Sequence, residues 1–321
     1  MITALPEAFL ERLRRLVPPD RLPMVEAAFR EPRAMAFRVN TLKVDRDTVQ
    51  AALEAEGLHP RPVAWYADAF QVPPEARAAL LESRPYRERW IYVQDLASML
   101  PPLVLAPEPD ARVLDLCAAP GSKTLQLACL MQGRGEIAAV EVVRPRFYRL
   151  KANVQAYGAP NVRLYLQDGT RVGRYRPEFF DYVLVDAPCS SEGRFHLSDP
   201  DTFAYWSLRK IREMARKQYR LLVSAVQSLR PGGVLVYATC TMAPEENEAV
   251  LDRLLRTFDG VLTVEPLDLP VSNQLPGLES WEGRSFHPEL RHARRILPTT
   301  EMEGFFLCRL RKRASTQRAR H

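Results

Sequence analysis

Two short apolar segments that each end in a cysteine constrain the fold of this chain more than any other feature of its sequence. Residues 183–189 read Val-Leu-Val-Asp-Ala-Pro-Cys, and residues 234–240 read Val-Leu-Val-Tyr-Ala-Thr-Cys. Such runs, rich in Val and Leu, are typical of buried parallel strands. A helical pattern over residues 207–229 and a turn at residues 230–233 lie between them. The segment therefore predicts a strand–helix–strand crossover, which is almost always right-handed.

Cys189 and Cys240 stand at the carboxyl ends of these two predicted strands. Ligands of open parallel sheets bind beyond those ends, and neighbouring strands lie about 5 Å apart. If the two strands are neighbours, both thiols face one pocket. Asp186, three residues before Cys189, adds a carboxylate to that pocket.

The composition is ordinary for a globular protein with one large domain and a smaller one: 321 residues, 46% hydrophobic and 26% charged. The apolar runs are too short to span a bilayer, and residues 1–17 lack the layout of a signal peptide. We therefore expect a cytoplasmic protein without a membrane partner, and a monomer. The net charge of +6 favours a polyanionic partner, although a merely solvated basic surface explains it equally well.

The five cysteines and five histidines predict neither a disulfide framework nor a metal site. The cysteine count is odd, no pair has the spacing of zinc ligands, and the histidines form no cluster. Cys129 and Cys308 lie within apolar patterns and are predicted to be packing residues.

From residue 112 onward the predicted strands and helices alternate regularly. Besides the two cysteine-terminated strands, strands are predicted over residues 112–116, 136–141, 162–166, 261–265 and 305–310, and helices over residues 122–132, 144–157, 207–229 and 244–258. An earlier short helix is predicted to end before Pro101, and residues 266–303 are predicted to be a long connection. The pattern predicts an α/β domain with a doubly wound, mostly parallel sheet.

The N-terminal residues 1–90 are predicted to form a small α+β subdomain, followed by the α/β domain over residues 91–312 and a basic, disordered tail over residues 313–321. Helices are expected over residues 5–17 and 24–29, then a strand over 35–40, a helix over 45–56 and a strand over 62–65. The subdomain either faces a nucleic acid or only covers the sheet. The nucleic-acid interpretation rests on a basic and aromatic set made of Arg38, Lys43, Arg46, Arg61, Trp65 and Tyr66, and on the tail residues Lys312, Arg313, Arg318 and Arg320.

The turn after the first strand of the α/β domain is predicted to bind a cofactor. It comprises Cys117, Ala118, Ala119, Pro120, Gly121, Ser122 and Lys123, and a helix starts there. The turn is neither a dinucleotide fingerprint nor a P-loop. Glu141 ends the second strand, where a carboxylate can bind ribose hydroxyls, and Asp168 follows the third strand, where it can accept from an adenine amino group. A turn and two acids in these places suit adenosine without a diphosphate, and S-adenosylmethionine is the candidate.

Five motifs make the chain resemble the Nop/Sun family of S-adenosylmethionine-dependent RNA cytosine-5 methyltransferases. They are residues 37–43 (Phe-Arg-Val-Asn-Thr-Leu-Lys), 115–124 (Asp-Leu-Cys-Ala-Ala-Pro-Gly-Ser-Lys-Thr), 186–193 (Asp-Ala-Pro-Cys-Ser-Ser-Glu-Gly), 237–248 (Tyr-Ala-Thr-Cys-Thr-Met-Ala-Pro-Glu-Glu-Asn-Glu) and 304–312 (Gly-Phe-Phe-Leu-Cys-Arg-Leu-Arg-Lys). The resemblance implies a Rossmann-like methyltransferase sheet. It also implies that residues 117–123 with Glu141, Asp168 and Asp186 contact the methyl donor, that Cys240 is the nucleophile, and that Cys189 helps to release the product.

The chemistry of cytosine methylation agrees with these implied roles. A thiolate that adds to carbon 6 of the base makes carbon 5 nucleophilic toward the sulfonium methyl group. Asp186 can bind the N3 or amino edge of the base, while Lys123 touches either the base or the donor. The base must leave its stack to reach the pocket.

Two other functions remain as alternatives. A DNA cytosine-5 methyltransferase uses the Pro-Cys cysteine, here Cys189, as its nucleophile and does not need Cys240. A non-catalytic RNA-binding ribosome assembly factor would not need Cys240 or Asp186, and both are present. The chain departs from some family members in having Ser-Ser after Cys189 and in ending soon after the last strand, so we expect no appended RNA-binding domain there. Ribosomal RNA is slightly favoured over transfer RNA, and the target cytosine stays open.

Overall fold

A computed structural model describes residues 4–317 of the chain, and a nine-stranded sheet lies at its centre. Five neighbouring strands run parallel, in the order β7 (Val162–Leu166), β6 (Glu136–Glu141), β5 (Arg112–Asp115), β8 (Phe180–Asp186) and β9 (Leu229–Thr239). The chain fills the sheet from β5 outward in one direction and then from β8 outward in the other. The point between β5 and β8 is therefore the switch point at which such sheets bind ligands.

The reversed strand β15 (Phe305–Lys312) pairs antiparallel with β9. Its other edge carries β10 (Leu262–Glu265) and β14 (Arg294–Ile296), and β11 (Gln274–Pro276) pairs with β14. Residues 266–303, predicted to be a connection, thus contain two short strands of the sheet and the hairpin β12 (Ser280–Trp281) with β13 (Arg284–Ser285). That prediction was wrong because strands of two or three residues are too short to show an alternating pattern.

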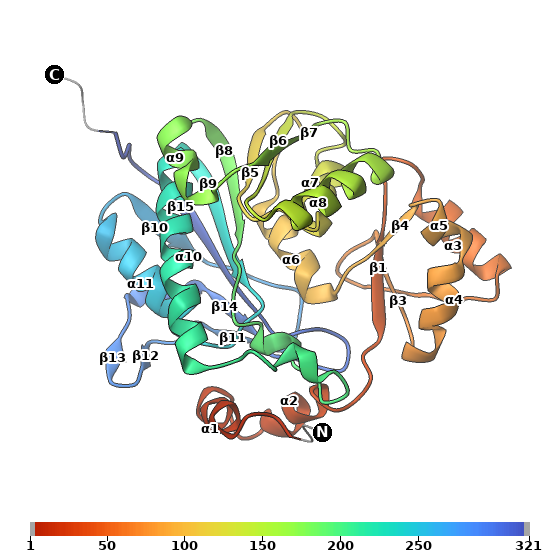
Figure 1. Cartoon of the computed structure of the whole chain (residues 1–321), viewed down its shortest axis with the longest axis horizontal. Coiled ribbons are helices and arrows are strands. Elements are labelled where there is room, and N and C mark those ends of the chain that lie inside the picture. The colour runs from red at the N-terminus through yellow and green to blue at the C-terminus, as the bar shows by residue number, and fades with distance from the viewer. Residues whose placement is uncertain (1–3, 318–321) are drawn as a thin grey trace.

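Helices cover both faces of the sheet (Figure 1), so the predicted doubly wound fold is confirmed. One face packs against α6 (Leu96–Leu105), α7 (Ser122–Leu130) and α8 (Arg144–Tyr157), and the other against α10 (Leu208–Ser228) and α11 (Glu248–Thr257), with α9 (Val172–Tyr175) beside α10. The strands alternate accordingly. Along β8, Leu184 belongs to the first core, while Val183 and Val185 belong to the second.

The predicted crossover between the two cysteine-bearing strands is confirmed. Strands β8 and β9 are parallel neighbours joined by α10, which Ser207 caps by accepting from Lys210 N. Between the pairs Phe180–Leu229 and Tyr182–Val234, β8 advances by two residues and β9 by five. The turn predicted at residues 230–233 therefore loops out of the paired strands, with Gly232 at a φ of 82°.

Two predicted helix boundaries were wrong, and a side-chain hydrogen bond lies at each of them. Helix α6 continues through Pro101 and Pro102, since Gln94 Nε2 donates to the Ser98 carbonyl that Pro102 cannot serve (3.0 Å). Helix α11 begins at Glu248 rather than Pro244, because Asn247 ties the preceding turn to the end of β9: it accepts from Thr239 Oγ1 (2.6 Å).

The first 93 residues contribute to two further cores, and some of them, such as Tyr66 and Tyr92, also join the core on the α6–α7–α8 face of the large sheet. An antiparallel sheet of β2 (Arg61–Pro62), β3 (Ala69–Val72), β1 (Met35–Val39) and β4 (Ile91–Val93) packs against α3 (Arg46–Ala55), α4 (Arg77–Glu82) and α5 (Arg84–Arg87). Helices α1 (Glu7–Leu16) and α2 (Leu22–Ala28) instead pack against residues of the α/β domain, among them Phe195 and Met242. Figure 1 shows these two helices below the large sheet, away from β1 and β3. The strand predicted over residues 62–65 is confined to Arg61–Pro62.

Several residues that the sequence assigned to a nucleic-acid surface are engaged inside the protein. Arg38 is 1% exposed and donates to Gln94 Oε1 (2.9 Å) and the Ser122 carbonyl (3.0 Å), and Tyr66 is also buried. Lys312 is buried and donates to Glu178 (2.8 Å), whose carboxylate also accepts from Thr316 N (2.8 Å). Residues 313–317 were expected to belong to a disordered tail, but Ser315 and Thr316 hydrogen-bond to Glu178. Arg318 and Arg320 lie outside the described residues.

Within residues 4–317, no helix has the length and apolar character needed to cross a membrane. In the same part of the chain, no group of three or more His, Cys, Asp and Glu side chains is placed to hold a metal ion.

Candidate active site

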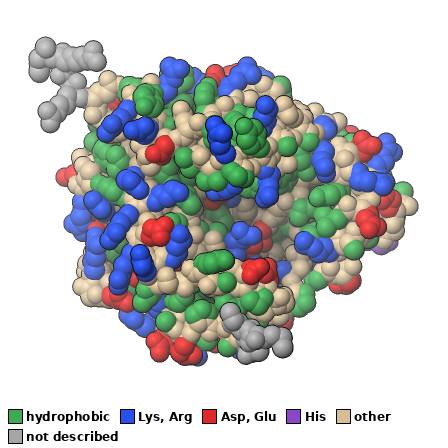
Figure 2. Space-filling model, in the orientation of Figure 1, with side chains coloured by type: hydrophobic (Ala, Val, Ile, Leu, Met, Phe, Trp, Pro, Cys, Tyr) green, Lys and Arg blue, Asp and Glu red, His purple; other side chains and the backbone are tan. Residues whose placement is uncertain are grey.

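A cleft of about 520 Å³ opens at the carboxyl ends of β5, β6, β8 and β9. Figure 2 shows the hollow near the centre of the face it presents. Most of the predicted site residues line this cleft: Cys117, Ala119, Pro120, Ser122, Lys123, Glu141, Asp168, Asp186, Cys189 and Cys240. Ala118 and Gly121 do not line it, because Ala118 is buried with its N–H donating to the Val140 carbonyl and Gly121 forms the cap of α7.

The predicted cofactor turn is held in place by hydrogen bonds at the end of β5 and from helix α8. Asp115 is buried and accepts from Thr124 Oγ1 (2.7 Å) on α7, and burial raises the pKa of its carboxyl to about 6. Two residues of α8 reach across to the turn: Arg146 Nη2 donates to the Ala119 carbonyl (2.6 Å) and Asn153 Nδ2 to the Pro120 carbonyl (2.8 Å). The turn is therefore a fixed platform at the start of α7.

The two acids predicted to bind a nucleoside end neighbouring strands at the rim of this platform. Glu141 is 3% exposed, accepts from Val143 N (2.8 Å) and lies 3.6 Å from Arg146 Nη1. A surface charge without a role would not be buried in this way. Asp168 follows β7 and accepts from Thr170 N (2.9 Å) and Thr170 Oγ1 (2.8 Å) while still facing the cleft.

Lys123, whose role the sequence left open, is paired with Asp186. Its Nζ donates to Asp186 Oδ2 (2.6 Å) and to Ser98 Oγ (2.8 Å) and lies 5.4 Å from the centre of the Phe305 ring. The ion pair fixes one carboxylate oxygen of Asp186 and leaves the other facing the cleft. Lys123 thus lines the cleft and positions Asp186, and its charge is neutralised by that carboxylate.

The two predicted catalytic thiols face one another, as their places on neighbouring strands require. Cys189 Sγ and Cys240 Sγ are 3.3 Å apart, and Ser191 Oγ lies 3.6 Å from Cys240 Sγ. Cys129 and Cys308, predicted to be packing residues, are buried outside the cleft. All five thiols are free.

The surroundings of the two thiols shift their pKa values in opposite directions. The hydrogen bond from Cys189 lowers the pKa of Cys240, and the Arg194 guanidinium lowers it further, against the effects of burial and of Glu303. The same hydrogen bond, burial and the Glu246 carboxylate raise the pKa of Cys189 well above its ordinary value. At rest, Cys240 is therefore the better thiolate and Cys189 the proton donor to it.

Several residues of the cleft escaped the sequence analysis, chiefly Arg194, Glu303, Asp95 and Ser98. Arg194 Nε donates to Glu303 Oε1 (3.2 Å), and Asp95 accepts from Glu303 N (3.1 Å). Burial, with the Glu303 charge, raises the pKa of Asp95 to about 7. Glu303 directly precedes the predicted last strand. If that strand had been paired with β9 in the prediction, Glu303 would have been expected beside the thiols. No sequence pattern indicates that Arg194 lies there.

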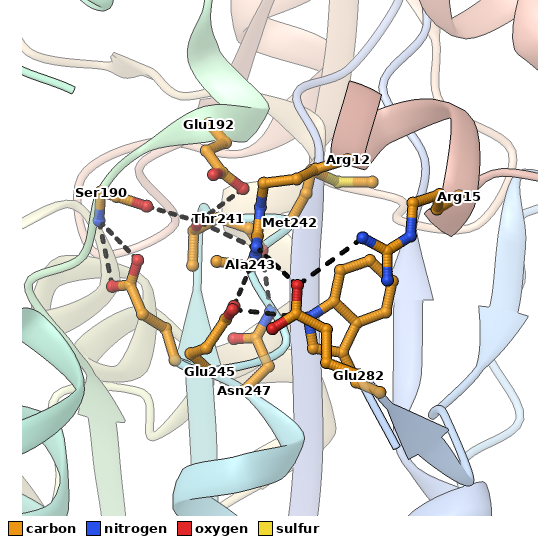
Figure 3. A network of polar contacts seen from close by, with 12 residues as sticks. Arg12, Arg15, Ser190, Glu192, Thr241, Met242, Ala243, Glu245, Asn247 and Glu282 are labelled. Carbon is orange, nitrogen blue, oxygen red and sulfur yellow. Dashed lines mark hydrogen bonds and ion pairs between the residues drawn. The ribbon is translucent and has the colours of Figure 1, made fainter. Parts of the chain in front are cut away.

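Behind the thiols, a polar network joins the loop after Cys189 to the loop after Cys240 (Figure 3). Ser190 Oγ lies 2.7 Å from Thr241 Oγ1, which donates to Glu192 (3.2 Å). Ser190 N donates to Glu246 (3.1 Å), which also accepts from Gln218 of α10 (2.7 Å). Burial raises the pKa of Glu246 to about 8. The two cysteines are thus held at a fixed separation by their own flanking residues.

Helix α1 braces the same two loops from outside. Arg12 Nη2 donates to Glu245 (2.6 Å), and Arg12 and Arg15 lie 5.3 Å and 4.5 Å from the centre of the Trp281 ring (Figure 3). On the other side, the Phe9 and Phe195 rings are 4.8 Å apart. One helix therefore contacts a residue that follows each thiol.

Two glycines let the backbone of three distant segments meet beside the thiols. Gly193 N donates to the Cys240 carbonyl (2.9 Å), and Gly304 N donates to the Gly193 carbonyl (2.9 Å). A Cβ atom at position 193 would lie 2.0 Å from the Gly304 oxygen. No residue with a side chain fits at position 193 without a backbone shift.

Two models of known protein families match the chain. The one described as 16S rRNA methyltransferase RsmB/F matches residues 102–311, and the one described as the N-terminal domain of 16S rRNA methyltransferase RsmF matches residues 5–96.

Curated relatives match most of the chain. Ribosomal RNA small subunit methyltransferase F of Photobacterium profundum is 35% identical over 98% of this chain and 65% of its own length, and that of Serratia proteamaculans 37% over 97% and 64%. A tRNA (cytosine(49)-C(5))-methyltransferase of Pyrococcus abyssi is 39% identical over 88% of this chain and 89% of its own length. This chain therefore spans a little under two thirds of the ribosomal RNA methyltransferases it resembles.

Solved structures share the fold. A methyltransferase homolog protein from Pyrococcus horikoshii has a TM-score of 0.78 at 31% identity, over 96% of this chain and 100% of that one. NSun6 from Pyrococcus horikoshii, solved with the S-adenosylmethionine analogue SFG, has a TM-score of 0.82 at 23% identity, over 98% and 100%.

Proposed function

The chain belongs to the 16S rRNA methyltransferase family RsmB/F, and we propose that it transfers a methyl group from S-adenosylmethionine to carbon 5 of a cytosine in structured RNA, through a covalent bond to Cys240. The observation that carries this proposal is the pair of thiols 3.3 Å apart with oppositely shifted pKa values. Attack needs a thiolate, whereas product release needs a second group that can hold and pass a proton.

The turn at residues 117–123 is the proposed seat of the methyl donor. The available groups suit a nucleoside: the buried Glu141 for ribose hydroxyls, Asp168 for an amino group, and the start of α7 behind the turn. When bound there, S-adenosylmethionine supplies a methyl group on a positively charged sulfur. The family is one of S-adenosylmethionine-dependent methyltransferases, which supports the same donor here.

The proposed reaction begins at Cys240. Its thiolate adds to carbon 6 of the base, and the electrons of the ring double bond move to carbon 5, which becomes nucleophilic. Asp186 presents the oxygen that Lys123 leaves free to the amino edge of the base. This interaction orients the ring over the thiols.

Release depends on Cys189. Once the Cys240 sulfur is bonded to carbon, it is neutral and no longer raises the pKa of Cys189. Cys189 can then lose its proton to water and accept the proton from carbon 5. The electrons of that C–H bond restore the ring double bond, and Cys240 leaves as a thiolate.

The same pKa directions disfavour the reversed assignment. A DNA-type enzyme would attack with Cys189, the thiol that its hydrogen bond to Cys240 and burial keep protonated. A non-catalytic assembly factor would have no use for a lowered Cys240 pKa or for the Lys123–Asp186 pair. Because the curated relatives are named for both ribosomal and transfer RNA, we propose 16S ribosomal RNA as the substrate and keep transfer RNA as the second candidate.

The two thiols are expected to fail at different steps when replaced. Cys189→Ala should still attack and transfer the methyl group but release slowly, so a protein–RNA adduct that survives denaturing gel electrophoresis should accumulate. Cys240→Ala should form none. Each variant is incubated with S-adenosylmethionine and a 16S ribosomal RNA fragment, a transfer RNA transcript or duplex DNA. Cys129→Ser, a change outside the cleft, serves as the control and should behave as the wild type.

An adduct with Cys240→Ala and none with Cys189→Ala would reverse the roles of the thiols. Adducts on duplex DNA alone would favour the DNA-type enzyme, and methylation of no substrate by the wild type would overturn the proposed activity.

A further inference from the structure

Helix α10 carries most of the charge surplus of the protein. Its 21 residues hold six cationic side chains against one acid, Glu213, a net of +5 where the whole chain has +6. The remaining surface is therefore close to neutral overall, and the positive charge is concentrated on one element.

Four arginines of α10 form a single exposed stripe, and we name it the α10 stripe: Arg209, Arg212, Arg216 and Arg220. Their spacing places them within an arc of about 80° and spreads them over about 16 Å of the helix axis. The sole acid on this helix is 3.2 Å from Lys210 instead. Throughout the described part of the chain, no carboxylate comes within ion-pair distance of the stripe's guanidinium groups.

The stripe borders the active-site cleft. The opposite side of α10 is buried against the sheet through residues such as Leu222 and Ala225, which fixes the helix in place. Between the two sides, Lys217 and Leu221 line the cleft. In Figure 2, Lys and Arg side chains gather over the region of α10 on the same face as the hollow.

An exposed aromatic side chain stands just before the stripe. Tyr205 is 88% exposed and precedes the Ser207 cap of α10, and Leu208 is also exposed. Stacking on aromatic rings is a general means of holding unpaired bases beside a phosphate-binding groove. Packing within the protein does not explain Tyr205, because its side chain is exposed to solvent.

We propose that the α10 stripe binds consecutive phosphates of the RNA substrate and guides the strand that carries the target cytosine to the cleft. This inference rests on the proposed function and adds to it the surface that receives the RNA. Arginine pairs with phosphate through two parallel hydrogen bonds, and the length of the stripe matches a few nucleotides of one strand. It replaces Arg38 and Lys312 as phosphate contacts, because both are buried and engaged within the protein.

The test compares two variants of equal charge. The stripe variant carries Arg209→Gln, Arg212→Gln, Arg216→Gln and Arg220→Gln, and the control carries the same change at four scattered exposed arginines, Arg30, Arg77, Arg87 and Arg163. Glutamine keeps the helix propensity of arginine. Binding of a fluorescein-labelled hairpin from 16S ribosomal RNA is measured by anisotropy across a salt series.

The stripe variant should bind at least tenfold more weakly at moderate salt. Its slope of log K against log salt should be lower by about 1 for each phosphate that the protein no longer neutralises. The control should keep nearly the wild-type slope. Equal weakening in both variants, or wild-type binding by the stripe variant, would overturn the proposal.

Two further measurements keep the result separate from the proposed function. Binding of S-adenosylmethionine should be unchanged in the stripe variant, which also reports its folding; if the fourfold variant does not fold, the pairs Arg209/Arg212 and Arg216/Arg220 are tested separately. A wild type that neither binds nor methylates RNA would refute the proposed function, whereas a stripe variant that methylates RNA as well as the wild type would refute this inference alone.

Discussion

Two identical side chains 3.3 Å apart differ in how easily they lose a proton. Their shared hydrogen bond lowers the pKa of Cys240 and raises that of Cys189, so ionising one thiol holds the proton on the other. The Arg194 guanidinium lowers the pKa of Cys240 further, because a cation favours the thiolate. We therefore expect the pair to be divided into the proposed attacker and the proposed proton donor before any substrate arrives.

Arg194→Met should reduce the reactivity of Cys240 by raising the pKa of its thiol. The rate of alkylation by iodoacetamide at Cys240, followed by mass spectrometry over a pH series, should rise at higher pH in this variant than in the wild type. Arg194→Lys keeps the positive charge beside Glu303 and should restore most of the wild-type profile. Two superimposable profiles for Arg194→Met and the wild type would show that the charge of Arg194 has no part in ionising Cys240.

At this scale, the sequence predicted the residues that stand at strand ends. Cys189, Cys240, Asp186 and Glu141 follow apolar runs, and the geometry of a parallel sheet brings them together. Arg38 was misplaced because a charged residue in a strand is usually exposed. Here the guanidinium of Arg38 donates to the Gln94 side chain and to the Ser122 carbonyl. Both partners are more than 50 residues away in the sequence, so no local pattern predicts them.

Among the elements, α1 has the least obvious role, since it lies outside the α/β domain in sequence but contacts the loops that follow Cys189 and Cys240. Its apolar side packs on Phe195, and its polar side reaches Glu245. These two residues follow Cys189 and Cys240 by six and five positions, respectively. Removing the helix contact would loosen both thiols together.

Arg12→Ala should lower the free energy of unfolding by about 1–3 kcal/mol, because Glu245 would be left without its charged partner in a partly buried place. Arg14→Ala on the same helix is the matched control. The Arg12 side chain is 10% exposed, whereas Arg14 is 52% exposed and pairs loosely with Glu7 at 3.4 Å, so the control should change stability by less than about 0.5 kcal/mol. Urea unfolding measures both. Equal destabilisation of the two variants would mean that α1 does not act through Glu245.

The elements that sequence patterns revealed are the long ones. The strands of the parallel sheet and helices α8 and α10 repeat their apolar spacing often enough to be recognised. Strands β11 to β14 have two or three residues each. Strand β14 pairs with the edge of β15 and β11 pairs with β14, while β12 and β13 pair only with each other. Helix α6 passes two prolines, and the Gln94 side chain supplies a donor to the Ser98 carbonyl that Pro102 cannot serve. None of these features repeats an apolar spacing that a sequence pattern could reveal.

For the molecule as a whole, the proposed methyl donor site lies where α7, α8 and the sheet meet. A ligand that binds only the folded chain stabilises all of it. At a hundred times Kd, S-adenosylmethionine should add about 2.7 kcal/mol, which raises the melting temperature of a chain this long by about 4 °C. The shift caused by the ligand, rather than the melting temperature itself, reports on the site.

Glu141→Ala should lack most of that ligand-induced shift, because the buried carboxylate is the proposed partner of the ribose hydroxyls. Glu136→Ala, at the opposite end of the same strand, should keep it. Differential scanning calorimetry with and without S-adenosylmethionine compares the three proteins. A full shift in Glu141→Ala would remove Glu141 from the donor site.

The contact between Gly193 and Gly304 limits how this cleft can be redesigned. A library that varies the loops around the thiols, in search of an enzyme for another base, cannot change position 193 without moving the backbone, and a Cβ atom at position 304 would lie only 3.0–3.1 Å from its neighbours. The first carbon of any side chain at position 193 would occupy the space of a backbone oxygen 2.0 Å away. Changes of specificity must therefore keep the backbone of this contact in place. An insertion that moves the loop of Gly193 will also move the segments of Cys240 and Gly304, because backbone hydrogen bonds join the three.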